Sequence, residues 1–174
     1  MQQKSFDEYR AFITDLDKKI DELLFDHSEH ITCKRGCDLC CYSFKVFPVE
    51  YFAIAAEFNL NQNPDKDNAI EERERCAFLQ NGACTIYNHR PMICRTHGLP
   101  LLNMNEDGTD WELSFCELNF TNADDDEFHD DNVLIQDRYN SMLFQINKAF
   151  LEKNNQLDYT EFDLIPLKEL LAKP

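Results

Sequence analysis

Residues 33–41 read Cys33-Lys34-Arg35-Gly36-Cys37-Asp38-Leu39-Cys40-Cys41. Four thiols fall within this short run, and gaps of three and two residues let successive sulfurs turn back toward a common point. Gly36 lies in the middle of the run and permits the unusual backbone angles that such a turn requires. Zinc ions and iron–sulfur clusters are held by several thiolates that converge on one centre. We therefore interpret residues 33–41 as a metal-binding knuckle.

The length and charge of the chain narrow the classes of protein that it can represent. With 174 residues, of which 43% are hydrophobic, the chain can bury one substantial core, so we expect a single domain over residues 1–174. The net charge of −16 leaves little basic surface to neutralise phosphates, which argues against nucleic acid or an anionic membrane as a partner. A solvated acidic surface accounts for this charge equally well.

The sequence also predicts a cytoplasmic protein. No apolar run approaches the roughly 20 residues that a membrane-spanning helix needs, and residues 1–10 lack the apolar centre of a signal peptide. In a reducing cytoplasm, clustered cysteines serve as metal ligands or redox groups more often than as disulfides. We therefore favour metal binding over a disulfide framework and over unrelated buried thiols. The candidate ligands are all eight cysteines: Cys33, Cys37, Cys40, Cys41, Cys76, Cys84, Cys94 and Cys116.

Long helices are predicted on both sides of the cysteine-rich segment. Apolar residues recur there at steps of three and four, which is the period of an amphipathic helix. The first helix is expected over about residues 5–26 and the second over about residues 128–152. A shorter helix is expected from Pro48, because proline is favoured in the first helical turn. The predicted apolar stripe of the second long helix consists of Ile135, Tyr139, Met142, Ile146 and Phe150.

A β-hairpin is predicted around Asn81-Gly82. This dipeptide lies between two short apolar runs and favours the tight turn of a two-residue hairpin loop. The pairing of the two strands would bring Cys76 close to Cys84.

A second hairpin is predicted between residues 99–104 and residues 111–115. It returns the chain so that we expect Cys116 to lie beside Cys94. The predicted fold class is mainly α (α+β): a helical bundle around a cysteine-rich metal module at about residues 33–116, with two short β-hairpins.

Spacing alone leaves the division of the eight thiols open. A tetrahedral zinc ion and a cubane iron–sulfur cluster each take four ligands, so the cysteines can form one site with four bystanders, or two sites. Adjacent Cys40 and Cys41 point in different directions and are poor partners for one mononuclear metal. One division therefore gives three knuckle cysteines to a site completed by a distant one.

Cys33, Cys37 and Cys40 also match the cysteine spacing of radical S-adenosylmethionine enzymes. Those enzymes use three thiolates and leave one iron open for the cofactor. The rest of the chain argues against this class, because it has no βα repeats for a barrel and only four glycines.

The order of the cysteine motifs resembles one known family. The motifs are Cys33-x3-Cys37-x2-Cys40-Cys41, Cys76-x-Phe78-Leu79, Cys84-Thr85-Ile86-Tyr87 and Arg90-Pro91-x2-Cys94-Arg95. Together they resemble the cysteine-cluster family of zinc- or iron-chelating domains, known as the CxxCxxCC domain and as YkgJ-type bacterial proteins. The resemblance implies a small cytoplasmic protein with a metal at its cysteines and, for most members, no assigned reaction. A related branch is associated with flagellin lysine methylation, but this sequence shows no pocket for a methyl donor.

Three further side chains near Cys94 are candidates for contacts with the ligands. Cationic Arg90 and Arg95 would offset the charge of a thiolate cluster, and donors to sulfur tune its potential. His97 is a candidate for a direct ligand or for such a contact. Alternatively, the arginines pair with carboxylates and His97 packs as an ordinary side chain.

We therefore expect a small cytoplasmic metal-binding protein whose thiolates hold an iron–sulfur cluster, with [4Fe–4S] favoured over zinc. Scattered ligands with an adjacent cysteine pair look unlike the paired knuckles of a zinc finger, whereas zinc is common wherever four thiolates converge. Two alternatives remain: a redox or transferase enzyme acting at an open coordination position, and a metal-trafficking or metal-sensing protein.

Overall fold

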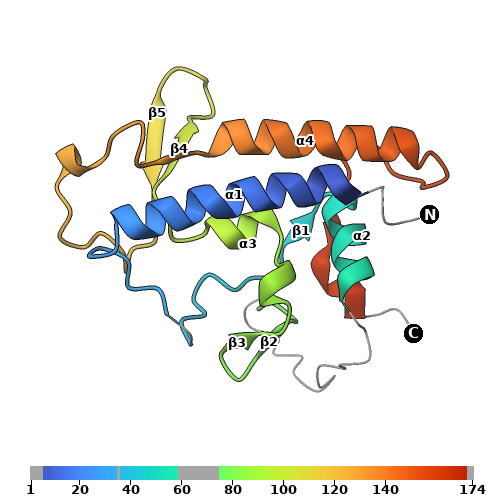
Figure 1. Cartoon of the computed structure of the whole chain (residues 1–174), viewed down its shortest axis with the longest axis horizontal. Coiled ribbons are helices and arrows are strands. Elements are labelled where there is room, and N and C mark those ends of the chain that lie inside the picture. The colour runs from blue at the N-terminus through green and yellow to red at the C-terminus, as the bar shows by residue number, and fades with distance from the viewer. Residues whose placement is uncertain (1–5, 35, 59–74, 172–174) are drawn as a thin grey trace.

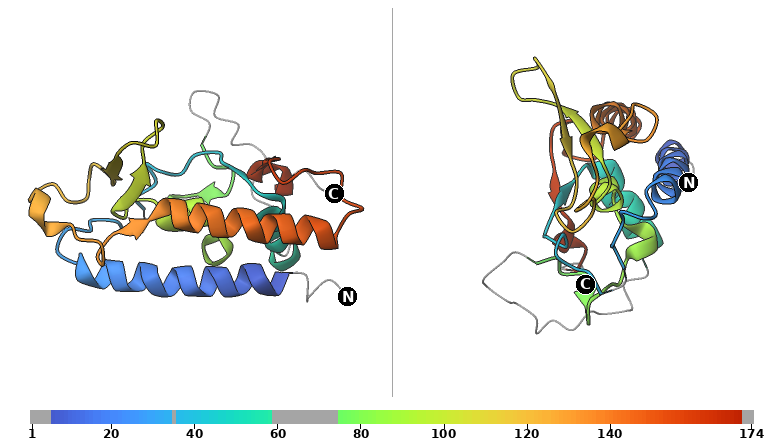
Figure 2. Two further views of the ribbon diagram at one scale, coloured as in Figure 1. Left: turned by 90° about the horizontal axis from the view of Figure 1, so that it is seen from above. Right: turned by 90° about the vertical axis from the view of Figure 1, so that its left-hand side faces the viewer.

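Two long antiparallel helices form one side of the molecule. A computed structural model of the chain describes residues 6–34, 36–58 and 75–171. Helix α1, Asp7–Asp26, and helix α4, Gln136–Lys153, lie side by side in the views of Figures 1 and 2. Helix α2, Pro48–Glu57, packs against both long helices, and the short helix α3, Met92–Thr96, packs against α1.

The apolar period predicted for the first helix is confirmed in α1. Its buried side chains recur at helical spacing, and the expected first residue, Ser5, lies outside the described part of the chain. Leu16 and Leu23 are completely buried, which stabilises the fold by about 1.5–3 kcal/mol for each side chain. The buried residues of α1 are Tyr9, Phe12, Leu16, Ile20 and Leu23.

The predicted start of the second long helix is wrong. Helix α4 begins at Gln136, because Leu134–Ile135 form strand β6 and pair in parallel with strand β4, Leu101–Met104. Asp125–Glu127, just before the expected start, form a 3₁₀ helix.

The predicted apolar stripe of α4 is also shifted. Met142 is 41% exposed, whereas its neighbour Leu143 is buried. Asn147 is completely buried. Its side chain accepts a hydrogen bond from the Val49 N–H at 3.1 Å and donates one to the Glu161 carbonyl at 3.2 Å, so its polar atoms have partners inside the core. This polar residue thereby satisfies a backbone donor in the first turn of α2, which has no partner within its own helix.

Both predicted hairpins are confirmed. Strand β2, Leu79–Gln80, pairs with strand β3, Ala83–Cys84, and the turn residues Asn81 and Gly82 have φ angles of 48° and 70°. Positive φ at both central residues is the geometry for which Asn-Gly is favoured.

The second hairpin joins β4 to strand β5, Trp111–Ser114, with Leu101 opposite Ser114. Strand β1, Lys45–Val46, pairs with strand β7, Ile165–Pro166, which the sequence did not predict. The remaining short elements are 3₁₀ helices at Tyr87–His89 and Leu167–Leu171. Helices with small separate sheets give the chain an α+β fold. Nowhere in the described ranges is a helix both long enough and apolar enough to span a membrane.

Two hydrophobic cores support the cysteine-bearing loops. The first core fills the space among α1, α2 and α4. The second core contains apolar residues of α2, the segment around β2 and β3, and the C-terminal 3₁₀ helix, and Cys76 and Cys84 pack against it. The hairpin that carries these cysteines is therefore anchored on a packed surface.

Candidate metal centre

All eight cysteines are free thiols. Cys33 is exposed, and the other seven are partly buried. The structure therefore gives no support to a disulfide framework and leaves every predicted ligand available to a metal.

Four of the thiols gather where the knuckle meets the segment after β5. We call Cys33, Cys37, Cys40 and Cys116 the first thiol set. Burial raises the pKa of the Cys40 thiol, and the charges of the other three thiolates raise it further. Cys33, Cys37 and Cys116 are therefore near enough to Cys40 for their charges to act on its thiol.

Gly98 makes the close approach of Cys33 and Cys116 possible. It has a φ angle of +92°, and a Cβ atom placed on it would lie 3.2 Å from the Cys33 Sγ and 3.8 Å from the Cys116 Cβ. The second hairpin was expected to carry Cys116 to Cys94, but the structure places Cys116 beside Gly98 and Cys33.

The buried side chain of Asn119 connects the Cys33 sulfur to the backbone near it. It is 1% exposed, and its Nδ2 donates to the Cys33 Sγ at 3.4 Å and to the Gly98 carbonyl at 2.8 Å. Its Oδ1 accepts a hydrogen bond from the Thr32 N–H at 2.9 Å. Sequence reasoning missed this residue, because a single asparagine outside a motif carries no signal of a contact with a cysteine far along the chain.

The other four thiols gather between the end of the knuckle and the first hairpin. We call Cys41, Cys76, Cys84 and Cys94 the second thiol set. The Cys76 N–H donates to the Cys41 carbonyl at 3.1 Å, which places the two backbones side by side. Cys84 pairs with Leu79, whose N–H donates to the Cys76 carbonyl at 3.1 Å, so the predicted approach of Cys76 and Cys84 is confirmed.

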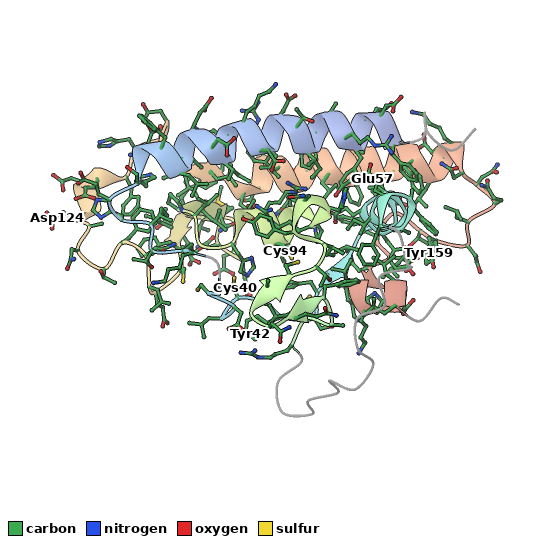
Figure 3. The ribbon with its side chains drawn as sticks, turned by 60° about the horizontal axis from the view of Figure 1, so that its bottom comes forward. Cys40, Tyr42, Glu57, Cys94, Asp124 and Tyr159 are labelled. Carbon is green, nitrogen blue, oxygen red and sulfur yellow. The ribbon has the colours of Figure 1, made fainter. Side chains whose placement is uncertain are left out.

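The thiols of the second set also influence one another's pKa values. Burial raises the pKa of Cys41 to about 12, and the thiolates of Cys40, Cys76 and Cys84 add to the increase. Burial is also the main cause of the raised pKa of Cys94, and the thiolates of Cys76, Cys84 and Cys41 raise it further. Figure 3 shows Cys94 on α3 and Cys40 of the knuckle on the same side of α1 and α4.

The sulfurs of each set are neighbours without being gathered around one point. Across residues 6–34, 36–58 and 75–171, no group of three or more histidine, cysteine, aspartate or glutamate side chains is arranged tightly enough to hold a metal ion. The composition of each set nevertheless fits a soft metal or a cluster, because both take four thiolates. Metal binding at either set requires its thiol side chains to rotate toward a common centre.

The cysteine-rich part of the chain matches one protein-family model. Residues 32–117 match the CxxCxxCC family model, described as "Putative zinc- or iron-chelating domain". We refer to residues 32–117 as the CxxCxxCC domain. The match confirms the resemblance found from the motifs, and the CxxCxxCC domain includes all eight cysteines. Neither the curated proteins nor the solved structures compared with the chain gave a match.

The two arginines of the CxxCxxCC domain differ in their surroundings. Arg95 is buried, and its Nη1 donates to both carboxylate oxygens of Asp17 at 2.7 Å, while its Nε donates to the Arg90 carbonyl at 2.8 Å. Arg95 thereby ties α3 to α1. Arg90 stacks on Tyr87 at 3.9 Å from the ring centre, and its charge lowers the pKa of Cys84, although burial raises that pKa more. Arg90 is therefore the arginine whose charge acts on a thiol.

His97 of the CxxCxxCC domain has one ring nitrogen engaged by the backbone. Its Nδ1 lies 2.6 Å from the Ile93 carbonyl, and because a carbonyl only accepts, Nδ1 carries a proton. In the neutral ring, Nε2 then has a free lone pair, which is the state in which histidine binds a metal. The ring also packs at 5.3 Å from Phe44.

A buried carboxyl group lies behind the second thiol set. Glu50 is 3% exposed, and burial raises its pKa to about 7. It accepts hydrogen bonds from the Met92 N–H at 3.0 Å and the Tyr9 hydroxyl at 3.5 Å, so it fixes the start of the helix that carries Cys94. The motif search did not single out this residue.

Two pockets formed by described residues lie away from the thiols of the CxxCxxCC domain. The larger, of about 590 Å³, is an open hollow on α1 between Lys18 and Asp26. The other, of about 260 Å³, lies between α1 and α2 beside Arg95. Neither is lined by a cysteine, so neither places a substrate cavity against the candidate ligands.

Proposed function

We propose that this protein is a small cytoplasmic bacterial metal-binding protein whose cysteine thiolates hold an iron–sulfur cluster, with [4Fe–4S] favoured and zinc as the alternative. The observation that carries the proposal is the gathering of eight free thiols within a CxxCxxCC domain. We extend the proposal to the architecture: residues 1–174 act as one domain in which helices surround a metal module.

The electrostatics of the thiols support a resident cation. Burial and neighbouring thiolates keep Cys40, Cys41 and Cys94 protonated at neutral pH when no metal is bound. A metal that binds must displace those protons, and its positive charge then removes the repulsion among the thiolates. When bound, an iron–sulfur cluster supplies one-electron chemistry, whereas zinc supplies structural cross-linking.

Residues around the thiols would support the bound group. Asn119 donates to the Cys33 sulfur, and a donor to sulfur stabilises the thiolate and tunes a cluster. The positive charge of Arg90 near Cys84 likewise favours the thiolate form of that side chain. We retain Arg95 and His97 as further candidates, Arg95 through its charge and His97 through Nε2.

Metal trafficking or sensing is the second candidate function. The exposure of Cys33 favours it, because an exposed ligand lets a competing donor attack the metal from solvent. An enzyme acting at an open coordination position needs a cavity beside the ligands, and neither of the two pockets formed by described residues on α1 is lined by a cysteine. The acidic net charge of −16 supports our expectation that neither nucleic acid nor a membrane is a partner.

Purification without oxygen, followed by metal analysis and a visible spectrum, tests the proposal. Brown protein that contains iron and acid-labile sulfide would support the iron–sulfur cluster. Colourless protein with stoichiometric zinc would show that the bound metal is zinc and not a cluster, and the proposal of metal binding would stand. Protein that binds neither metal, even after anaerobic reconstitution, would refute the proposed function.

A further inference from the structure

We propose that the domain holds two separate metal centres rather than one, each bound by four thiolates. The first centre uses Cys33, Cys37, Cys40 and Cys116, and the second uses Cys41, Cys76, Cys84 and Cys94. This inference rests on the proposed function, because it assumes that the thiols bind metal. Each centre would take a soft divalent ion such as zinc or a cubane iron–sulfur cluster, the two groups that four thiolates suit.

The first centre is built by contacts that do not involve the second set. Gly98 leaves the space into which Cys33 and Cys116 fit, since a Cβ atom at this position would lie only 3.2 Å from the Cys33 sulfur. Asn119 connects the Cys33 sulfur to the Gly98 carbonyl and to Thr32. The Cys37 N–H donates to the Lys34 carbonyl at 2.9 Å, which turns the knuckle back on itself.

The second centre is built on different elements. The hydrogen bond from the Cys76 N–H to the Cys41 carbonyl is followed by an isolated bridge between Tyr42 and Arg75, so two strand-like segments run together. The hairpin then brings Cys84 back toward Cys76, and both pack against the second hydrophobic core.

The helix that carries Cys94 completes the second centre. Glu50 accepts the Met92 N–H and fixes the start of α3, and the Cys94 N–H donates to the Pro91 carbonyl at 3.0 Å. Cys94 is thus presented from a helix that packs against α1, whereas Cys116 comes from the segment after β5.

The peptide between Cys40 and Cys41 is the junction of the two centres. The Cys41 N–H donates to the Asp38 carbonyl at 3.0 Å, and the Tyr42 N–H donates to the Cys40 carbonyl at 3.0 Å. This turn directs consecutive side chains to different neighbours. Cys41 lies beside the segment that carries Cys76, because its carbonyl accepts the Cys76 N–H at 3.1 Å. An adjacent cysteine pair is therefore what two centres that share a knuckle require.

Pairs of cysteine-to-serine substitutions test the division. C33S/C116S removes two ligands from the first set, and C76S/C84S removes two from the second. The matched control is C33S/C76S, which removes the same number of thiols but takes one from each set. Each variant and the unaltered chain are titrated without oxygen with cobalt(II), whose absorption reports four-thiolate coordination, and bound zinc is counted in parallel.

The division predicts two equivalents of four-thiolate cobalt in the unaltered chain, one in each within-set variant and none in the cross-set control. A single site with bystander thiols would give a different result. The unaltered chain and one within-set variant would each bind one equivalent of cobalt, and the other within-set variant would bind none. That result would overturn the division. Loss of all metal from both within-set variants would overturn it in favour of one shared cluster.

The titration of the unaltered chain keeps the test decisive if a variant fails to fold. Saturation at one equivalent would overturn the two-centre proposal while metal binding itself stands. Saturation at two, with the same four-thiolate spectrum throughout, supports it. An unaltered chain that binds no cobalt and no zinc would instead refute the proposed function together with the division.

Discussion

Substitution of Gly98 by alanine tests the packing of the first thiol set. The added Cβ would lie 3.2 Å from both the Cys33 Sγ and the Asn119 Nδ2, on a backbone with a φ angle of +92°. Two costs therefore combine: an unfavourable backbone conformation for an alanine, and a methyl group forced against two side chains that already contact each other.

The size of the effect follows from these two costs. A left-handed backbone costs a residue with a Cβ about 1–2 kcal/mol, and an extra methyl group in a packed site costs about 1–3 kcal/mol. Gly98→Ala should therefore lower the free energy of unfolding by about 2–5 kcal/mol. Gly108→Ala is the matched control, because Gly108 also has a positive φ angle of 68° but no atom lies within 4 Å of its Cβ position. It should cost only about 1–2 kcal/mol.

Denaturant unfolding of both variants measures the difference. Cobalt titration of the same proteins should show weaker binding of one equivalent in Gly98→Ala, with the other equivalent unchanged. Equal destabilisation by the two substitutions, together with unchanged metal binding in Gly98→Ala, would refute the close packing of Cys33, Asn119 and Cys116 around Gly98.

Three further predictions concern buried polar groups and the thiols. Asn119→Ala should lower the free energy of unfolding by about 1–3 kcal/mol, because groups bonded to the amide become unsatisfied, and should weaken one cobalt equivalent; an unchanged titration would contradict its role beside Cys33. The pKa of Glu50 is raised from 4.5 to about 7, so the folded state binds more protons between these pH values and the stability from Glu50 is lost as pH rises through about 7. Denaturation at pH 5 and pH 8 should show a loss of about 3 kcal/mol that Glu50→Gln removes; the same loss in the variant would contradict this assignment. Because the pKa values of Cys41 and Cys94 are raised, zinc binding at pH 7 should release protons and tighten as pH rises; binding that leaves a weakly buffered pH indicator unchanged would contradict protonated ligands.

The parts of the fold that could be predicted from the sequence depend on local signals. The apolar period of α1 follows from 3.6 residues per turn, and the Asn81-Gly82 hairpin follows from the φ angles that those two residues tolerate. The start of α4 was misplaced because Leu134 and Ile135 pair with β4, a contact between segments far apart in the chain. The spacing of apolar residues within a segment carries no information about such a distant partner strand.

The candidate cysteines could be predicted more fully than their grouping in space. Cysteine spacing pointed to all eight thiols as candidate ligands, and the adjacency of Cys40 and Cys41 indicated that the two are poor partners for one mononuclear metal. Which distant cysteine accompanies which knuckle cysteine depends on tertiary packing, and Cys116 lies beside Cys33 because Gly98 leaves room there. Asn119 and Glu50 were missed for the same reason, since their partners are distant in sequence.

X-ray absorption at the metal edge of anaerobically purified protein tests the central claim, that cysteine thiolates hold a metal, most directly. The account predicts nearest neighbours that are sulfur alone, at about 2.3 Å, with iron–iron scattering in addition if the group is a cluster. Nearest neighbours dominated by nitrogen or oxygen would contradict the claim, because the metal would then lie away from the cysteines of the CxxCxxCC domain.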